Sequence, residues 1–103
     1  MSRWVEAGTA ADFADGDVRA VEIGDTNIAI YQVGGAFFAT SNICTHAFAL
    51  LSDGFLDECT IECPLHAGRF DIRTGKAEGG PVSQDLETYP VKVESGAVLI
   101  DLG

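Results

Sequence analysis

The sequence predicts an all-β protein made of antiparallel sheets with short strands. Segments with strand-like composition lie between glycine-containing dipeptides, and no stretch carries a long helical period of apolar residues. Twelve glycines in 103 residues fall mostly between these segments, where turns are expected. A chain of this length also predicts a single domain, residues 1–103.

The first half of the chain predicts a hairpin of long strands. Val18–Ile23 alternates in polarity and is followed by a Gly24-Asp25 turn. Thr26–Val33 is strand-like and ends at Gly34-Gly35, which is a strong two-residue hairpin signal. We therefore expect Ala36–Thr40 to return as its antiparallel partner.

The second half predicts two more strand pairs. Thr60–Glu62 and Arg69–Ile72 are expected as short strands around a Cys/His-containing segment. Tyr89–Glu94 and Ala97–Leu102 flank Ser95-Gly96 and are expected to form a closing hairpin.

Three features outside these strands carry their own predictions. Thr9–Phe13 suggests about one helical turn, with Thr9 as its N-cap. Trp4 is interpreted as an anchoring core aromatic near the first strand. Cys59 is interpreted as a small, buried or partly buried hydrophobe rather than a metal ligand.

Charge and hydropathy narrow the function classes. The formal net charge is −10, from 16 acids and 6 bases, which disfavours nucleic acid as a partner. A partner with a basic patch fits this acidity, and so does acidity that serves only solubility. No apolar run approaches the ~20 residues of a membrane helix, and MSRWVEAG lacks a signal-peptide core. We therefore expect no membrane association and a cytoplasmic location.

Cysteine and histidine form two boxes in the middle of the chain. Three cysteines are too few, and odd in number, for a disulfide framework. Cys44 and His46 form the first box, and Cys63 and His66 form the second. The full pattern is C-x-H-x16-C-x-x-H, so each box offers one thiolate and one imidazole as metal ligands.

Two kinds of metal centre suit four such ligands. A structural zinc site with two cysteines and two histidines is common, but the usual finger pairs like ligands within each arm. Here each arm is mixed. Mixed arms suit a centre with two unlike ends, such as a [2Fe–2S] cluster that has two cysteines on one iron and two histidines on the other.

These boxes resemble those of the Rieske iron–sulfur proteins. The C-T-H at 44–46 and the C-P-L-H at 63–66 carry the resemblance, and the length is similar to that of the small Rieske ferredoxins of bacterial aromatic-ring-hydroxylating dioxygenase systems. GGP at 79–81 resembles the loop that covers the cluster, and TYPVKVESGAVLI resembles the closing hairpin. The resemblance implies a β-sandwich with two cluster-binding loops at one tip, in a subdomain of about residues 41–75.

The resemblance also implies a ligand set and a role. Cys44 and Cys63 would bind the inner iron of one [2Fe–2S] cluster, and His46 and His66 would bind the outer iron. The chain would be an electron carrier and not an enzyme, because no histidine remains for a mononuclear iron site of two histidines and a carboxylate. A flavin-dependent NAD(P)H ferredoxin reductase would supply single electrons, and a terminal oxygenase would receive them from a monomeric protein.

The sequence departs from respiratory Rieske proteins at four positions. Ala49 and Leu65 stand where that group has the two cysteines of an inter-loop disulfide. Gly68 and Phe70 stand where it has a serine and a tyrosine, whose hydroxyls bond to cluster and cysteine sulfurs. Without these hydrogen bonds the reduced centre is less favoured, so we expect a potential near the low end of the Rieske range, about −150 mV.

Three alternatives remain open from the sequence. They are a structural zinc module, the small Rieske-like subunit of a nitrite reductase, and a Rieske ferredoxin that serves a different oxygenase.

Charged residues near the second box also have two interpretations each. Four acids lie between the boxes: Asp53, Asp57, Glu58 and Glu62. They fit a docking patch and a solvated face equally well. Three of the six bases lie close after the second box: Arg69, Arg73 and Lys76. They either balance nearby acids or contact a partner.

Overall fold

The computed structural model describes residues 2–45, 49–65, 68–79 and 84–103, and this part of the chain forms three antiparallel sheets. The first sheet has the order β1-β11-β10, with β1 (Trp4–Thr9), β10 (Val91–Glu94) and β11 (Ala97–Asp101). The second has the order β2-β3-β4-β9, with β2 (Val18–Ile23), β3 (Thr26–Val33), β4 (Ala36–Ser41) and β9 (Thr88–Tyr89). The third has the order β5-β6-β7-β8, with β5 (Phe55–Asp57), β6 (Thr60–Glu62), β7 (Arg69–Asp71) and β8 (Ala77–Gly79). Two short 3-10 helices, η1 (Ala10–Asp12) and η2 (Leu51–Asp53), complete the described elements.

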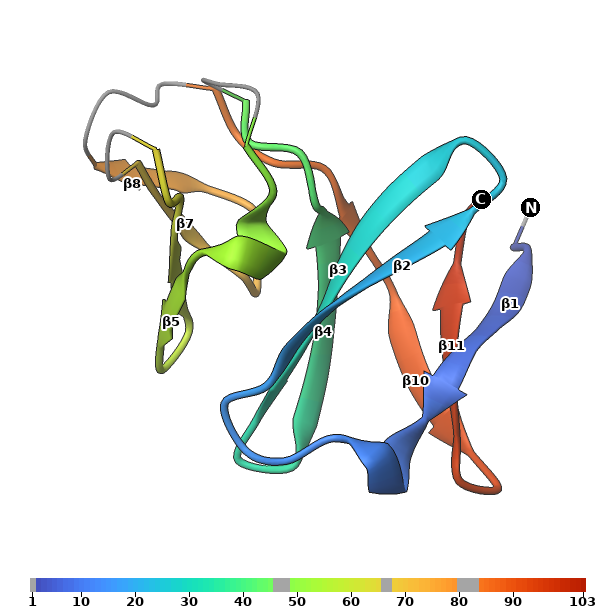
Figure 1. Cartoon of the computed structure of the whole chain (residues 1–103). Coiled ribbons are helices and arrows are strands. Elements are labelled where there is room, and N and C mark those ends of the chain that lie inside the picture. Colours follow the sequence, from blue (N-terminus) through green and yellow to red (C-terminus); the bar gives the residue numbers. More distant parts are fainter. Residues whose placement is uncertain (1, 46–48, 66–67, 80–83) are drawn as a thin grey trace.

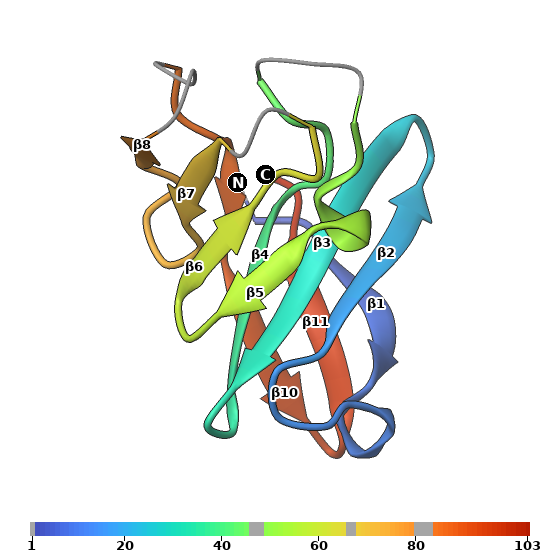
Figure 2. The same ribbon diagram turned by 60° about the vertical axis from the view of Figure 1, so that its left-hand side comes forward.

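The second sheet lies between two apolar cores. Successive side chains of a strand point to opposite faces. Ile28 and Ile30 of β3 pack in a core shared with the first sheet, whereas Ala29 and Tyr31 pack in a core shared with the third sheet. Figures 1 and 2 show the third sheet as a separate layer beside the β2–β4 strands. The predicted all-β sandwich is therefore confirmed, and β3 is its central strand.

The predicted hairpin of long strands is also confirmed. β2 and β3 have the predicted bounds, and β3 pairs with β4 from Ile28↔Ser41 to Val33↔Ala36. Gly34 and Gly35 close the turn with φ values of 58° and 86°. Residues with side chains rarely adopt this left-handed region, which explains why the glycine pair was a reliable turn signal.

The closing hairpin differs from its prediction in one respect. Tyr89–Glu94 is not one strand, because Thr88–Tyr89 belongs to the second sheet and Val91–Glu94 to the first. Pro90 lies between the two and has no N–H with which to continue a ladder. The chain crosses from one sheet to the other at this proline.

Strands β1, β5 and β8 were not predicted from the sequence. β1 contains a register shift between Glu6 and Gly8, which disturbs the alternation of its side chains. β5 and β8 are three residues each, too short to display a period, whereas the equally short β6 and β7 were expected because they flank the second box.

One prediction at the start of the chain was wrong, and another was confirmed in position only. Trp4 is not a core residue: it is 38% exposed, and the Lys92 ammonium lies 4.2 Å from the centre of its ring. Val5 pairs with the buried Ile100, so the neighbouring Trp4 points to the outer face. The expected helical turn exists as η1 with Thr9 at its N-cap position, but the Thr9 side chain makes no capping hydrogen bond.

Within the described residues, no helix has the length and apolar character needed to cross a bilayer.

Candidate metal centre

After the end of β4, backbone hydrogen bonds between two segments form a short stem, and this stem carries Cys44 of the first box. The Leu51 N–H donates to the Asn42 carbonyl oxygen at 2.8 Å, and Ile43 and Leu50 form a bridge. The Cys44 N–H then donates to the Ala49 carbonyl oxygen at 3.0 Å. Cys44 therefore stands on the last rung of this stem, and its side chain is 4% exposed.

The second box begins at the end of the β6–β7 hairpin. These strands pair from Thr60↔Asp71 to Glu62↔Arg69. The ladder continues one step further, because the Cys63 N–H donates to the Gly68 carbonyl oxygen at 2.7 Å. Cys63 is 1% exposed, so its sulfur is held at the base of the loop and directed into the core.

The two cysteines come together in the core below these loops. Burial raises the pKa of the Cys63 thiol above its usual value, and a hydrogen bond with the Cys44 thiol raises the pKa further. The Leu65 N–H lowers the pKa by donating a hydrogen bond toward the Cys63 sulfur. Two neighbouring free thiols on separate loops suit a metal that binds both sulfurs, because a bound metal replaces their protons.

Both predicted histidine ligands, His46 and His66, lie outside the described residues, as do Gly80 and Pro81 of the predicted covering loop. Among residues 2–45, 49–65, 68–79 and 84–103, no three His, Cys, Asp or Glu side chains gather as a possible metal site. The predicted ligands brought together by the described structure are thus Cys44 and Cys63.

A third segment, residues 84–87, adjoins the first loop and the turn between β7 and β8. The Thr45 hydroxyl donates to the Gln84 carbonyl oxygen at 2.8 Å, and the Leu86 N–H donates to the Gly75 carbonyl oxygen at 2.7 Å. Gly75 has a φ of 78°, and a Cβ atom there would lie 2.2 Å from the Leu86 carbonyl oxygen. Only glycine allows this approach, which brings the third segment against the third sheet.

Phe70 is the central apolar residue below the second loop. It pairs with Ile61 and Ala77 across the third sheet, and it is completely buried in the core that contains Cys44 and Cys63. A phenyl ring in this position offers no hydrogen bond to sulfur.

The predicted partial burial of Cys59 is confirmed. It is partly buried against the same core, and its carbonyl oxygen accepts the Ile72 N–H at 2.9 Å. Its contribution is packing and a turn contact beside β6.

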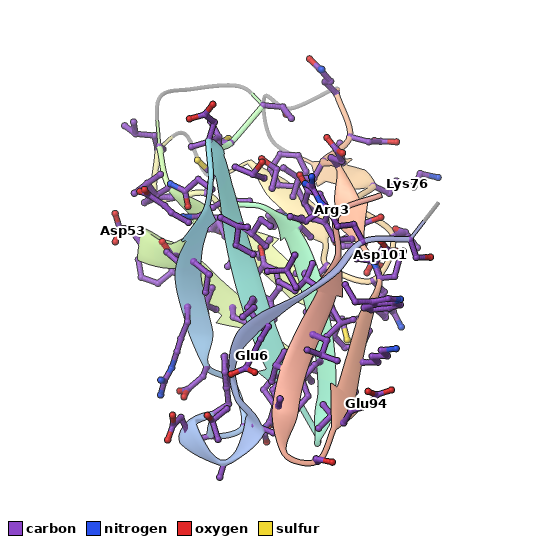
Figure 3. The ribbon with its side chains drawn as sticks, turned by 90° about the vertical axis from the view of Figure 1, so that its right-hand side faces the viewer. Arg3, Glu6, Asp53, Lys76, Glu94 and Asp101 are labelled. Atoms are coloured by element: carbon purple, nitrogen blue, oxygen red, sulfur yellow. The ribbon has the colours of Figure 1, made fainter. Side chains whose placement is uncertain are left out.

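Exposed charged and apolar residues lie on the third sheet and beside the cysteine loops. Asp53, Asp57 and Glu58 are exposed, and Phe55 is an exposed aromatic residue on the edge strand β5. Ile43 and Leu65, which lie next to the two cysteine loops, are also exposed. Figure 3 shows Asp53 and Lys76 projecting from opposite sides of this end.

The sequence did not identify Asn42 or the Thr45–Gln84 contact as parts of the site. Asn42 is a completely buried polar residue two positions before Cys44. No local spacing reveals its partners, although an asparagine just before a metal-binding box is a weak signal of a loop anchor.

Comparisons with known proteins agree with this geometry. The sequence matches the Rieske [2Fe-2S] domain family over residues 3–90. It is 50% identical over 100 residues to the ferredoxin component of the naphthalene 1,2-dioxygenase system of Pseudomonas putida, covering 97% of this chain and 96% of that protein.

Solved structures of ferredoxins are also similar to this chain. The Sphingomonas yanoikuyae B1 ferredoxin is 41% identical with a TM-score of 0.93, covering 98% of this chain and 100% of that one. A chain in a complex of reduced oxygenase and oxidized ferredoxin in carbazole 1,9a-dioxygenase is 38% identical with a TM-score of 0.91. The match covers 95% of this chain and 92% of that one.

The chain therefore belongs to the Rieske [2Fe–2S] family. Within that family it groups with the ferredoxin components of aromatic dioxygenase systems, which are electron carriers rather than catalytic subunits.

Proposed function

We propose that this chain is the ferredoxin of an aromatic-ring-hydroxylating dioxygenase system, and that it binds one Rieske cluster through Cys44, His46, Cys63 and His66. It accepts single electrons from a flavin-dependent NAD(P)H reductase and passes them to a terminal Rieske non-haem iron oxygenase that acts in aromatic compound catabolism. The naphthalene dioxygenase ferredoxin at 50% identity supports this system, and the carbazole complex supports the oxygenase partner.

One observation of the structure supports the ligand set more than any other. Two buried cysteine thiols from two separate hairpin stems lie side by side, and each is followed within three residues by a histidine in the sequence. Two thiolates and two neutral imidazoles are the donor set of a Rieske centre, and the bound cluster supplies a one-electron redox couple.

The chain's own residues have three tasks in this proposal. The stems hold the two sulfurs, the apolar core around Phe70 excludes water from them, and the exposed Ile43 and Leu65 offer apolar contact to a partner. We assign these tasks to a cluster-binding subdomain of about residues 41–75 within a single domain of residues 1–103. We further infer that the protein works as a monomer in the cytoplasm.

An EPR spectrum of the dithionite-reduced protein tests this proposal, with iron and sulfide assayed on the same sample. We expect two irons and two sulfides per chain and the low average g value of a histidine-ligated cluster. An EPR-silent sample with one zinc ion would make the four ligands a structural clip and overturn the proposal. Turnover with purified reductase and oxygenase then tests the partners.

A further inference from the structure

The amide of Asn42 joins three segments at the base of the first loop. Its Nδ2 donates to the Asn27 Oδ1 and to the Ser52 Oγ, each at 3.1 Å. Its Oδ1 accepts the Ser52 N–H at 2.8 Å. Asn42 is 0% exposed and its partners Asn27 and Ser52 are partly buried, so water has limited access to these bonds.

The main chain of Asn42 repeats these connections. Its N–H donates to the Asn27 carbonyl oxygen at 2.9 Å, and its carbonyl oxygen accepts the Leu51 N–H at 2.8 Å. Both ends of segment 43–50 are therefore connected to Asn42, one through the peptide bond to Ile43 and the other through the hydrogen bond from Leu51. One side chain links the strand before the loop, the helix η2 after it and the neighbouring strand β3.

We propose that Asn42 is a positioning residue for electron transfer, which holds the first loop and the Cys44 sulfur in one place on the sandwich. This inference rests on the function proposed above, because it needs Cys44 to be a cluster ligand. Residues that support metal ligands without touching the metal control affinity and electronic properties, and they must hold those ligands to within a fraction of an ångström.

An apolar residue could fill the space of Asn42 but could not replace its bonds. The Ser52 N–H and the Asn27 Oδ1 would then lack partners in a partly buried place, and leaving such groups unpaired is costly. The local way to relieve that cost is for η2 and the stem to move apart. Because Cys44 stands on this stem, such movement displaces its sulfur.

The test compares Asn42→Ala with Val98→Ala in the cluster-loaded protein. Val98 is completely buried in the other core, shared with the first sheet, so its truncation weakens the fold away from the cysteines. Iron release to a chelator, the EPR g values, the exchange rate of the Ser52 amide proton and the thermal midpoint are measured for both variants.

We expect Asn42→Ala to release iron about tenfold faster than the unchanged protein, to shift the g values and to speed Ser52 amide exchange. Val98→Ala should lower the thermal midpoint and leave the g values and Ser52 exchange unchanged. Asn42→Ala with Asn27→Ala should be no worse than Asn42→Ala alone, because both changes remove the same bond.

Equal iron release, g values and exchange in the Asn42→Ala and Val98→Ala proteins would overturn the inference. If Asn42→Ala does not fold, Ser52→Ala removes only the Oγ acceptor and should release iron about two- to threefold faster. Iron release from Ser52→Ala at the rate of the unchanged protein would also overturn the inference. A missing Rieske spectrum in the unchanged protein would be the failure of the proposed function instead.

Discussion

Cys63 shows how a single residue is placed by its backbone. Its N–H bond to the Gly68 carbonyl oxygen extends the β6–β7 ladder by one step, so the loop starts only after the cysteine. The sulfur is therefore held by a regular sheet, while the residues after it are free to form the loop. Cys44 occupies the equivalent place on its own stem.

The phenyl ring of Phe70 leads to the first prediction. Phe70→Tyr adds a hydroxyl near the cysteine sulfurs, and a hydrogen bond to sulfur stabilises the extra negative charge of the reduced centre. We expect the reduction potential to rise from about −150 mV toward the middle of the Rieske range, and Gly68→Ser to add to that rise. Protein-film voltammetry measures both. No rise, with an intact cluster spectrum, would refute the hydrogen-bond explanation.

His66 leads to the second prediction. His66→Ala removes one proposed imidazole ligand, so we expect loss of the cluster or of its Rieske EPR spectrum. Cys59→Ala is the matched control, because Cys59 is a cysteine outside the proposed ligand set, and it should keep the spectrum. If His66→Ala leaves the spectrum unchanged, His66 is not a ligand.

At the scale of elements, the β7–β8 hairpin depends on one carboxylate. Asp71 is the last residue of β7, and its carboxylate accepts bonds from the Arg73 N–H at 2.8 Å and from the Arg73 guanidinium at 3.1 and 2.9 Å. The Asp71 carbonyl oxygen also accepts the Gly75 N–H at 2.7 Å. These bonds shape the turn that carries Gly75, on which the third segment packs.

The pKa of Asp71 leads to the third prediction. The Arg73 side chain lowers the pKa of this carboxyl below its ordinary value, so the folded state favours the charged form. Its contribution is therefore complete above the ordinary pKa of about 4 and is lost as the pH falls through the lower folded value. We expect Asp71→Asn to lower the free energy of unfolding by about 1 kcal/mol at pH 7.

Denaturant unfolding followed from pH 7 to pH 2.5 checks this prediction. The difference between the unchanged protein and Asp71→Asn should narrow as the pH falls below about 4. Asp57→Asn is the control, because Asp57 is an exposed carboxylate in the same cross-strand row. A constant difference at every pH would show that the ion pair is not its source.

At the scale of the whole molecule, the net charge is −10, and the ion pairs that offset acidic side chains are unevenly distributed over the surface. The ion pairs within the described residues join Arg19 to Asp17, Arg73 to Asp71 and Lys92 to Glu94. The four acids between the two boxes take part in none of them. Glu62 stands opposite the exposed Phe55 in the β5–β6 register and directly precedes Cys63, so this acidic face begins beside the second loop and extends to Asp57 and Glu58 at the β5–β6 turn.

This acidic face leads to the fourth prediction. The quadruple change Asp53→Asn, Asp57→Asn, Glu58→Gln and Glu62→Gln should slow turnover with the reductase about tenfold at low salt. The effect should shrink at high salt, where surface charges are screened. Stopped-flow reduction at both salt concentrations measures it.

Glu6→Gln with Glu94→Gln serves as the control for the acidic face. Figure 3 shows Glu6 and Glu94 away from the end that carries Asp53 and Lys76. This double variant should change the rate of reduction by the reductase far less, per charge removed, than the quadruple variant does. If the quadruple variant reacts normally at both salt concentrations, the four acids are ordinary solvated surface.

Local features of the chain were sufficient to predict several elements and to mark the two Cys/His boxes. Glycine pairs mark hairpins through their own backbone freedom, and alternation along Val18–Ile23 and Thr26–Val33 reports the strands directly. Strands β1, β5 and β8 were missed, because a bulge disturbs the period of β1 and the other two are too short to show one.

The sequence by itself determined the fold class, the turn positions and the two Cys/His boxes, because each depends on residues a few positions apart. The tertiary structure decided which sheet each part of the closing hairpin joins, that Cys44 and Cys63 meet, and that Asn42 links Asn27 to Ser52. These facts depend on hydrogen bonds and packing between segments far apart in the chain. No local period records such contacts, so they exist only once the sheets have packed together.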